Sequence, residues 1–231
     1  HWCQVNRISP EAPVPVCRVE STTLSPGGAG NVANNLRHLD VPVSLLGCVG
    51  KDSSGEKLLN CIDEKKINYD GVIQINKPTI LKSRVVAHNQ QVVRLDREGD
   101  GPVSVKDRNL LFKQYQEKLV HCSAVVISDY MKQTLTESFL RKLIDAAKKN
   151  NKLIVVDPKG HSFLKYKGAS IITPNFKEFQ SVVGENVDSE NKIFEYGKRI
   201  IKKCSLDAIV LTRSEKGMSV ITESKKIDIK T

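Results

Sequence analysis

The residues best suited to hold an anion lie in the stretch Ser25-Pro26-Gly27-Gly28-Ala29-Gly30-Asn31, where three glycines fall within four positions. Glycine lets the backbone adopt positive φ and approach another molecule closely. From Ala29 onward the apolar residues recur at helical spacing, which predicts that the glycines lie at a helix N-terminus. Free N–H groups at such an end bind anions and hydroxyl oxygens, although a tight turn that only packs a strand on a helix explains the same residues.

A second candidate site opens a predicted helix at Asn175-Phe176-Lys177-Glu178. Asn175 is expected to cap this helix with Glu178 in a capping box, which is a purely structural explanation. The functional interpretation is that Glu178 holds a metal-bound water while the helix end faces a phosphate, since Mg²⁺ in proteins keeps several waters. In the loop Asp157–Gly160, Lys159 could neutralise a phosphate. Asp129 could accept hydrogen bonds from sugar hydroxyls, or it could be an ordinary surface acid.

The glycine stretch also fits the G-x-G-x-x-A pattern of dinucleotide-binding proteins, with Asp52 in place of the ribose-binding acid. That pattern should follow a buried strand directly. Here Glu20–Pro26 separates the glycines from the nearest apolar run. A dinucleotide-dependent oxidoreductase is therefore a distant alternative.

The first half of the chain alternates between strand and helix patterns, as in a parallel sheet, up to about residue 65. The sequence predicts a strand ending near Glu20, the glycine-led helix, a strand over 41–49, and a helix to Lys65 capped by Ser53 or Ser54. Half-exposed strands are predicted over 71–75, 80–88 and 91–97, with a hairpin turn at Asn89-Gln90. With the strand at 14–20 they are expected to form a small separate sheet that acts as a lid; an ordinary edge hairpin is the alternative.

The second half returns to the α/β alternation. It predicts helices over 104–121, 136–149, 175–183 and 188–203, and strands over 124–128, 153–156, 170–173, 208–212, 218–222 and 226–229. Polar loops follow several of these strands at their carboxyl ends, which is where open parallel sheets bind ligands. The loops are Ser128–Tyr130, Asp157–Gly160, Thr173–Asn175 and Thr212–Ser214.

Length and composition limit the classes of protein that the chain can represent. Its 231 residues suit one large domain, and its net charge of +10 comes mostly from lysines on predicted helix faces. Only 5% of the residues are aromatic, and no apolar run is long enough to span a membrane. The six cysteines and five histidines are dispersed without metal-ligand spacing. We therefore expect a cytoplasmic protein with neither nucleic acid nor membrane as a partner.

These motifs resemble those of the ribokinase-like (PfkB) carbohydrate kinases. The glycine stretch looks like the first signature of that family, and Asn175–Glu178 matches its N-x-x-E motif. Further stretches resemble the branch of D-glycero-β-D-manno-heptose-7-phosphate kinases, which act in lipopolysaccharide precursor synthesis: Arg7–Val16, Asn89–Gln91, Arg94–Asp96, Ser128–Tyr130, Asp157–Gly160, Thr173–Asn175 and Thr212–Met218. The resemblance implies a three-layer α/β sandwich with a mainly parallel central sheet. It further implies one kinase domain over 1–231, with lid strands at about 13–20 and 71–97.

The same resemblance implies a site for each substrate. The sugar-phosphate site would comprise Gly27, Gly28, Asn31, Asn89, Arg94, Asp96, Asp129 and Lys159. The nucleotide site would comprise Asn175, Phe176, Lys177, Glu178, Thr212, Arg213, Ser214 and Gly217, with Glu178 contacting the metal through water. The implied reaction moves the γ-phosphoryl group of ATP, with Mg²⁺, to the anomeric hydroxyl of heptose 7-phosphate for ADP-heptose synthesis. Members of the family often form homodimers through their lids, and we expect the same here.

One family signature, D-T-x-G-A-G-D, has no counterpart among the 231 residues. We expect its catalytic Asp beyond Thr231 and a first strand before His1, so that the domain is incomplete at both ends and no catalytic base is assigned within this chain. Two alternatives remain. The chain could be another sugar or sugar-phosphate kinase of this fold, or a non-catalytic relative that binds a sugar or a nucleotide.

Overall fold

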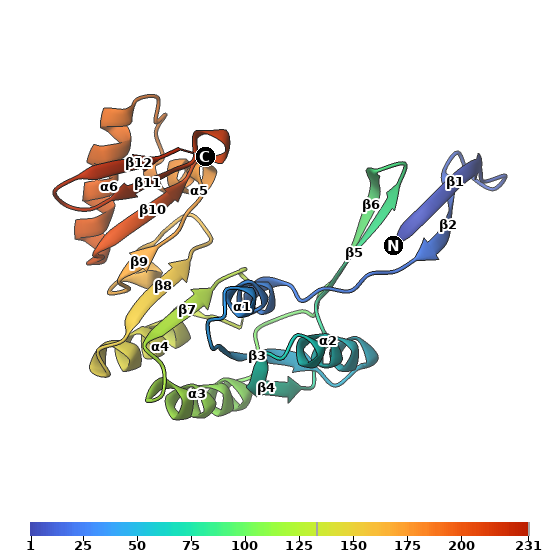
Figure 1. The fold of residues 1–231 in the computed structure, drawn as a ribbon, viewed down its shortest axis with the longest axis horizontal. Coiled ribbons are helices and arrows are strands. Elements are labelled where there is room, and N and C mark those ends of the chain that lie inside the picture. The colour runs from blue at the N-terminus through green and yellow to red at the C-terminus, as the bar shows by residue number, and fades with distance from the viewer. Residues whose placement is uncertain (133, 231) are drawn as a thin grey trace. The chain divides into compact units, whose positions relative to one another are not determined.

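The computed structural model describes residues 1–132 and 134–230. The expected base beyond Thr231 lies outside these residues. The chain divides into two compact units, His1–Gly101 and Pro102–Thr231 (Figure 1). No helix in the described ranges is both long and apolar enough to cross a membrane.

The first unit contains two helices and six strands, coloured blue to green in Figure 1. They are β1 (Trp2–Ile8), β2 (Pro15–Ser21), α1 (Gly28–His38), β3 (Ser44–Gly50), α2 (Ser53–Glu64), β4 (Asn68–Ile75), β5 (Leu81–Ala87) and β6 (Gln90–Arg97). A core cluster formed by Ala33, Leu45, Ile62 and Ile67 joins the helices to the parallel pair β3–β4.

The other four strands form the lid, a sheet with the order β2-β1-β5-β6. Few of its side chains are buried, and every residue of β6 is exposed. Strand β1 was not predicted from the sequence. It pairs antiparallel with β2 and parallel with β5, so it owes its extended form to partners on both sides. The predicted separate lid sheet is therefore present, with β1 as an additional strand.

Three predictions for the first unit are wrong in detail. Residues 71–75 belong to β4 and pair with β3 outside the lid, because Ile73 and Ile75 are buried. The hairpin turn is His88-Asn89, since these two residues carry the positive φ values of 49° and 59° that a two-residue hairpin loop needs. Helix α2 is capped by Asp52, whose Oδ1 accepts from the N–H of Gly55 at 2.8 Å, so neither Ser53 nor Ser54 is the cap.

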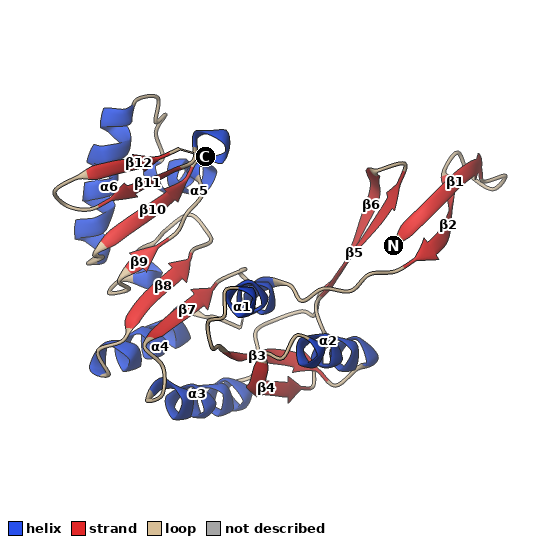
Figure 2. Ribbon diagram, viewed as in Figure 1, coloured by secondary structure: helices blue, strands red, loops and turns tan. Residues whose placement is uncertain are grey.

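The second unit confirms the predicted α/β alternation (Figure 2). Its helices are α3 (Val105–Leu119), α4 (Glu137–Lys149), α5 (Phe176–Val183), α6 (Glu190–Cys204) and the short 3₁₀ turns η1 (Leu164–Tyr166) and η2 (Ser214–Lys216). Its strands are β7 (Ala124–Ser128), β8 (Leu153–Asp157), β9 (Ile171–Ile172), β10 (Ala208–Thr212), β11 (Met218–Ile221) and β12 (Lys226–Ile229).

These strands form one sheet with the order β12-β11-β10-β9-β8-β7, in which β7 to β10 run parallel. Strands β11 and β12 continue the sheet as an antiparallel hairpin. Helix α4 buries Leu140, Ile144 and Ala147 completely, at the spacing of one helix face. Because β7 to β9 are parallel, their carboxyl ends lie at one edge of the sheet, and the loops there carry the polar residues discussed next.

Candidate phosphate and sugar-phosphate sites

The N-terminus of α5 combines a capping box with a lysine. Asn175 accepts a hydrogen bond from the backbone N–H of Glu178 at 2.9 Å, and Glu178 Oε2 accepts one from the N–H of Asn175 at 2.9 Å. The structural explanation of this pair is therefore confirmed. The other carboxylate oxygen of Glu178 accepts from the ammonium group of Lys159. The hydrogen bond with Glu178 raises the pKa of Lys159, against the opposing effect of burial.

This arrangement brings a lysine and a helix N-terminus together at the carboxyl edge of the parallel strands. Lys159 follows β8, and Asn175 follows β9. The helix dipole and the ammonium group both favour an anion, and Lys159 retains 35% side-chain exposure. Of the remaining predicted residues on this turn, Lys177 is exposed and Phe176 is half-buried.

Asp129 lies in the interior, with only 1% of the residue exposed. Its Oδ2 accepts from Lys165 Nζ at 2.7 Å and from the Tyr166 hydroxyl at 2.6 Å, while Oδ1 accepts from the N–H of Met131 at 2.8 Å. Burial, followed by the hydrogen bond with Asp129, raises the pKa of Tyr166. The alternative of a surface acid is therefore wrong, because this carboxylate is enclosed by partners from η1.

Asp157, at the end of β8, has an unusual electrostatic environment. Burial raises the pKa of its carboxyl group, and the nearby negative charges of Glu178 and Asp129 act in the same direction against Lys159. From the sequence, Asp157 is named only as the first residue of the loop that holds Lys159. Lys165 and Tyr166 were missed, because a short turn without a motif gives no signal of contact with a residue far along the chain.

The loop after β10 lies beside the N-terminus of α5. Asn175 and Thr212 form a bridge, and the N–H of Thr212 donates to the carbonyl of Pro174 at 3.0 Å. The structure thus brings two predicted nucleotide-site segments together. Ser214 is exposed in the same loop and has a φ of 52°.

Arg213, predicted near the phosphates, is engaged elsewhere in this structure. Its guanidinium group contacts both carboxylate oxygens of Glu190, at 2.9 and 2.5 Å, and Ser219 Oγ at 3.1 Å. Lys226 and Asp228 complete the network, since Lys226 Nζ lies 2.6 Å from each of the two carboxylates. The hydrogen bonds with Glu190 raise the pKa of Arg213. This network joins β10, β11 and β12 to α6.

Position 217 requires a glycine because the backbone of β12 comes close to it. Its φ is 77°, and a Cβ atom there would lie 2.0 Å from the carbonyl oxygen of Ile229. Its own carbonyl accepts from the N–H of Arg213 at 2.8 Å. A structural role therefore accounts for this glycine.

In the first unit, the glycine stretch opens α1 as predicted. Gly27 is the N-cap residue and makes no side-chain cap, while Gly28 has a φ of 51°. A Cβ atom at Gly27 would meet nothing within 4 Å. Asn31 is exposed on the first turn. This N-terminus retains room for an anion or a hydroxyl group.

Asp52, the acid that the dinucleotide alternative requires, has a structural role. Asp52 Oδ1 accepts from the Thr79 hydroxyl at 2.6 Å as well as from Gly55, and Oδ2 accepts from the N–H of Thr79 at 2.8 Å. The hydrogen bond from the Thr79 side chain is the main cause of the lowered pKa of Asp52. The structure therefore disfavours a ribose-binding role for Asp52.

The lid carries the other predicted sugar-phosphate residues. Asn89 is in the hairpin turn, and Arg94 Nε lies 3.0 Å from Asp96 Oδ1. Lys82 Nζ lies 3.5 Å from the other oxygen of Asp96. Desolvation raises the pKa of Asp96, but the charges of Arg94 and Lys82 outweigh it, and the net shift is downward. The exposed guanidinium of Arg94 is available to an anion.

The predicted residues divide between the two units. Gly27, Gly28, Asn31, Asn89, Arg94 and Asp96 lie in the first, while Asp129, Lys159 and all the predicted nucleotide-site residues lie in the second. Over residues 1–132 and 134–230, no group of three or more His, Cys, Asp or Glu side chains is arranged to hold a metal ion. Because both oxygens of Glu178 already have partners, that residue fits Mg²⁺ through water better than by direct coordination.

Comparison with known proteins places these features in a family. The model of the pfkB family carbohydrate kinases matches residues 3–231. A bifunctional protein HldE from Pasteurella multocida is 43% identical over 216 residues, which are 94% of this chain and 44% of that protein. The chain thus spans about half the length of the curated relatives it matches.

Solved structures share the fold at low sequence identity. Phosphofructokinase-2 from Escherichia coli, in complex with fructose-6-phosphate, matches with a TM-score of 0.80 at 19% identity, over 99% of this chain and 75% of that one. Arabidopsis thaliana ribokinase, in complex with ribose and ATP, matches with a TM-score of 0.74 at 17% identity, over 99% and 73%. These matches confirm the predicted ribokinase-like α/β fold with its small lid sheet.

Proposed function

Because the chain belongs to the pfkB family of carbohydrate kinases, we propose that its protein transfers the γ-phosphoryl group of ATP to the anomeric hydroxyl of D-glycero-D-manno-heptose 7-phosphate. This step would serve ADP-heptose and lipopolysaccharide core synthesis. The resemblance of the stretches from Arg7 to about Ile221 to heptose-phosphate kinases supports this acceptor over other sugars. The identity of 43% to a bifunctional protein HldE supports the same branch.

The observation that carries the proposal is the Lys159–Glu178 pair at the N-terminus of α5. Phosphoryl transfer depends on positioning and on stabilising the charge of the transferred group. A lysine beside free backbone N–H groups supplies both. We assign the nucleotide phosphates to this helix end, with Phe176, Lys177, Thr212, Ser214 and Gly217 in the surrounding segments.

Magnesium is proposed as the companion of ATP, held by Glu178 through a water molecule. The ion would neutralise charge on the phosphates. The carboxylates of Glu178 and Asp129 both act on Asp157, although burial is the main cause of its raised pKa, and a divalent cation bound near these acids would favour their charged forms.

The acceptor is assigned to Gly27, Gly28 and Asn31, to the lid residues Asn89, Arg94 and Asp96, and to Lys159. Two cationic side chains in this set, Arg94 and Lys159, suit an acceptor that already carries a phosphate. Asp129 belongs to the same predicted set, but its carboxylate oxygens are occupied by protein donors and would have to exchange a partner to reach a sugar hydroxyl.

We further propose a cytoplasmic homodimer that pairs through the lid. The six cysteines are free thiols, which suits a reducing compartment. On β6, the apolar residues Val92, Val93 and Leu95 are 42%, 44% and 58% exposed. Pairing of two lids would cover them. A monomeric mass by light scattering at micromolar concentration would refute the dimer, and Val93→Lys should shift a dimer toward monomer.

The test of the function is ADP release by the purified gene product with Mg·ATP and a panel of acceptors. The panel contains heptose 7-phosphate, fructose 6-phosphate, ribose and adenosine. Turnover confined to heptose 7-phosphate is the expected result. Turnover on another acceptor would keep the family and overturn the substrate, whereas binding of a sugar phosphate without turnover would favour a non-catalytic relative.

A further inference from the structure

The hydroxyl of Tyr166 joins three segments of the second unit. Tyr166 is fully buried, and its hydroxyl donates to Asp129 Oδ2 at 2.6 Å. The same oxygen accepts from the backbone N–H of Lys159 at 2.9 Å. Tyr166 in η1 is thereby tied both to the residue that follows β7 and to the loop that follows β8.

The bond to Lys159 fixes a loop that has few other backbone donors. Pro158 has no N–H, so the amide of Lys159 is the first donor after Asp157. Gly160 follows with a φ of 99°, a conformation that turns the chain sharply. Without the tyrosine hydroxyl, the Lys159 amide would lose this acceptor at a part-buried position, and a donor left unpaired away from water is costly.

The fixed backbone leads directly to the proposed phosphate site. The ammonium group of Lys159 contacts Glu178, whose second oxygen accepts from the N–H of Asn175. A displacement of the Lys159 backbone would move its ammonium group away from the N-terminus of α5. The capping box between Asn175 and Glu178 would remain, because neither of its hydrogen bonds involves Tyr166.

We propose that Tyr166 is a positioning residue that holds the Lys159 backbone through its hydroxyl and so sets the Lys159 ammonium group against Glu178. The consequence for phosphoryl transfer rests on the proposed function. The positioning itself does not, and it is tested separately below.

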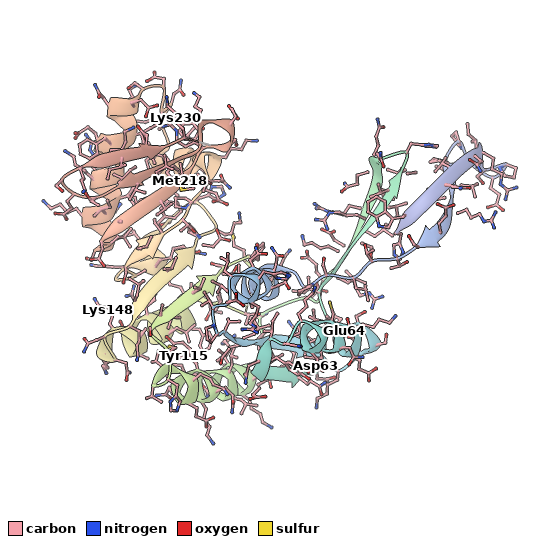
Figure 3. The ribbon with its side chains drawn as sticks, in the orientation of Figure 1. Asp63, Glu64, Tyr115, Lys148, Met218 and Lys230 are labelled. Atoms are coloured by element: carbon pink, nitrogen blue, oxygen red, sulfur yellow. The ribbon has the colours of Figure 1, made fainter. Side chains whose placement is uncertain are left out.

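Tyr115 provides a matched control. It is also buried, with 7% exposed, and its hydroxyl donates to the carbonyl of Leu143 at 3.0 Å. Tyr115 lies on α3, where Figure 3 labels it, and contacts none of the predicted site residues in the interactions described above. Tyr166→Phe and Tyr115→Phe therefore each remove one buried hydroxyl. The Tyr115 hydroxyl donates to one carbonyl, whereas the Tyr166 hydroxyl has Asp129 Oδ2 and, at 3.1 Å, the Lys159 carbonyl as acceptors and also accepts from the Lys159 N–H.

The kinetic test compares both variants with the wild-type gene product at a temperature where all three are folded. In Tyr166→Phe we expect kcat to fall about three- to tenfold, the factor that one neutral hydrogen bond represents. We expect KM for Mg·ATP to stay within about twofold, because the capping box is intact. Tyr115→Phe should change neither constant. An unchanged kcat in Tyr166→Phe, or an equal fall in Tyr115→Phe, would overturn the proposal.

Amide hydrogen exchange tests the positioning without any activity. Exchange at the Lys159 amide, followed by NMR, should accelerate about three- to tenfold in Tyr166→Phe and stay unchanged in Tyr115→Phe. Unchanged exchange at Lys159 in Tyr166→Phe would overturn the positioning role. If the wild-type protein phosphorylates no acceptor, the proposed function fails while the exchange result still decides this inference.

Discussion

Replacing Gly217 by Ala tests whether this predicted phosphate-site residue serves the fold. The added Cβ atom would lie 2.0 Å from the carbonyl oxygen of Ile229 and 3.0 Å from its carbonyl carbon. Both obstacles are backbone atoms, so β12 must move to make room. The backbone there, with a φ of 77° and a ψ of −127°, adds strain of about 1–3 kcal/mol for any L side chain. Overpacking of this kind costs a further ~1–3 kcal/mol.

We therefore expect Gly217→Ala to destabilise the second unit by about 2–6 kcal/mol, which is the sum of strain and overpacking. For a protein of this size, that loss lowers Tm by on the order of 10 °C. Differential scanning calorimetry of the wild-type and variant proteins measures the shift.

Gly184→Ala is the control for a positive φ without a close backbone approach. Gly184 has a similar φ of 74°, although its ψ is 6° where that of Gly217 is −127°, and a Cβ atom there would meet nothing within 4 Å. Its replacement should cost only about 1 kcal/mol. If Gly217→Ala lowered Tm no more than Gly184→Ala, the close approach of Ile229 would not be what requires a glycine at this position.

Three further substitutions have expected outcomes. Burial raises the pKa of Asp157, so the folded state binds this proton more tightly, and wild-type stability falls as pH rises from the reference value of 3.8 through the folded pKa. The stability of Asp157→Asn relative to wild type should therefore grow over that range in urea titrations, and a constant difference would contradict the assignment. Arg213→Lys should lose about 1–2 kcal/mol without a change in KM for Mg·ATP, because Lys lacks the planar fork of two nitrogens that pairs with the two oxygens of Glu190. A raised KM at full stability would instead place Arg213 on the phosphates. Thr79→Val should cost about 1–3 kcal/mol in thermal unfolding, since the buried N–H of Gly50 loses its acceptor; a cost below about 0.5 kcal/mol would show that the amide finds another.

Much of the fold could be predicted from local sequence patterns. Periodicity predicted the alternation of strands and helices in the second unit. The glycine stretch and the capping residue Asn175 predicted where α1 and α5 begin, and the structure confirms these predictions. The prediction failed where the structure depends on which strand pairs with which. Residues 71–75 have the alternation of a half-exposed strand in either sheet, and only the burial of Ile73 and Ile75 shows that this part of β4 pairs with β3.

The sequence also predicted the residues of the candidate site better than the contacts between them. Motifs identified Lys159, Asn175 and Glu178, and the structure brings these three together. No local pattern could show that Arg213 faces Glu190 or that Tyr166 reaches the Lys159 amide. Those contacts join segments that meet only when the sheet forms.

The measurement that tests the central claim most directly is ³¹P NMR of the product that the gene product makes from Mg·ATP and heptose 7-phosphate. The proposed function predicts a second sugar phosphorus signal, coupled to the anomeric proton, that grows in step with ADP. No new sugar phosphorus signal, or a phosphate on another hydroxyl, would contradict it.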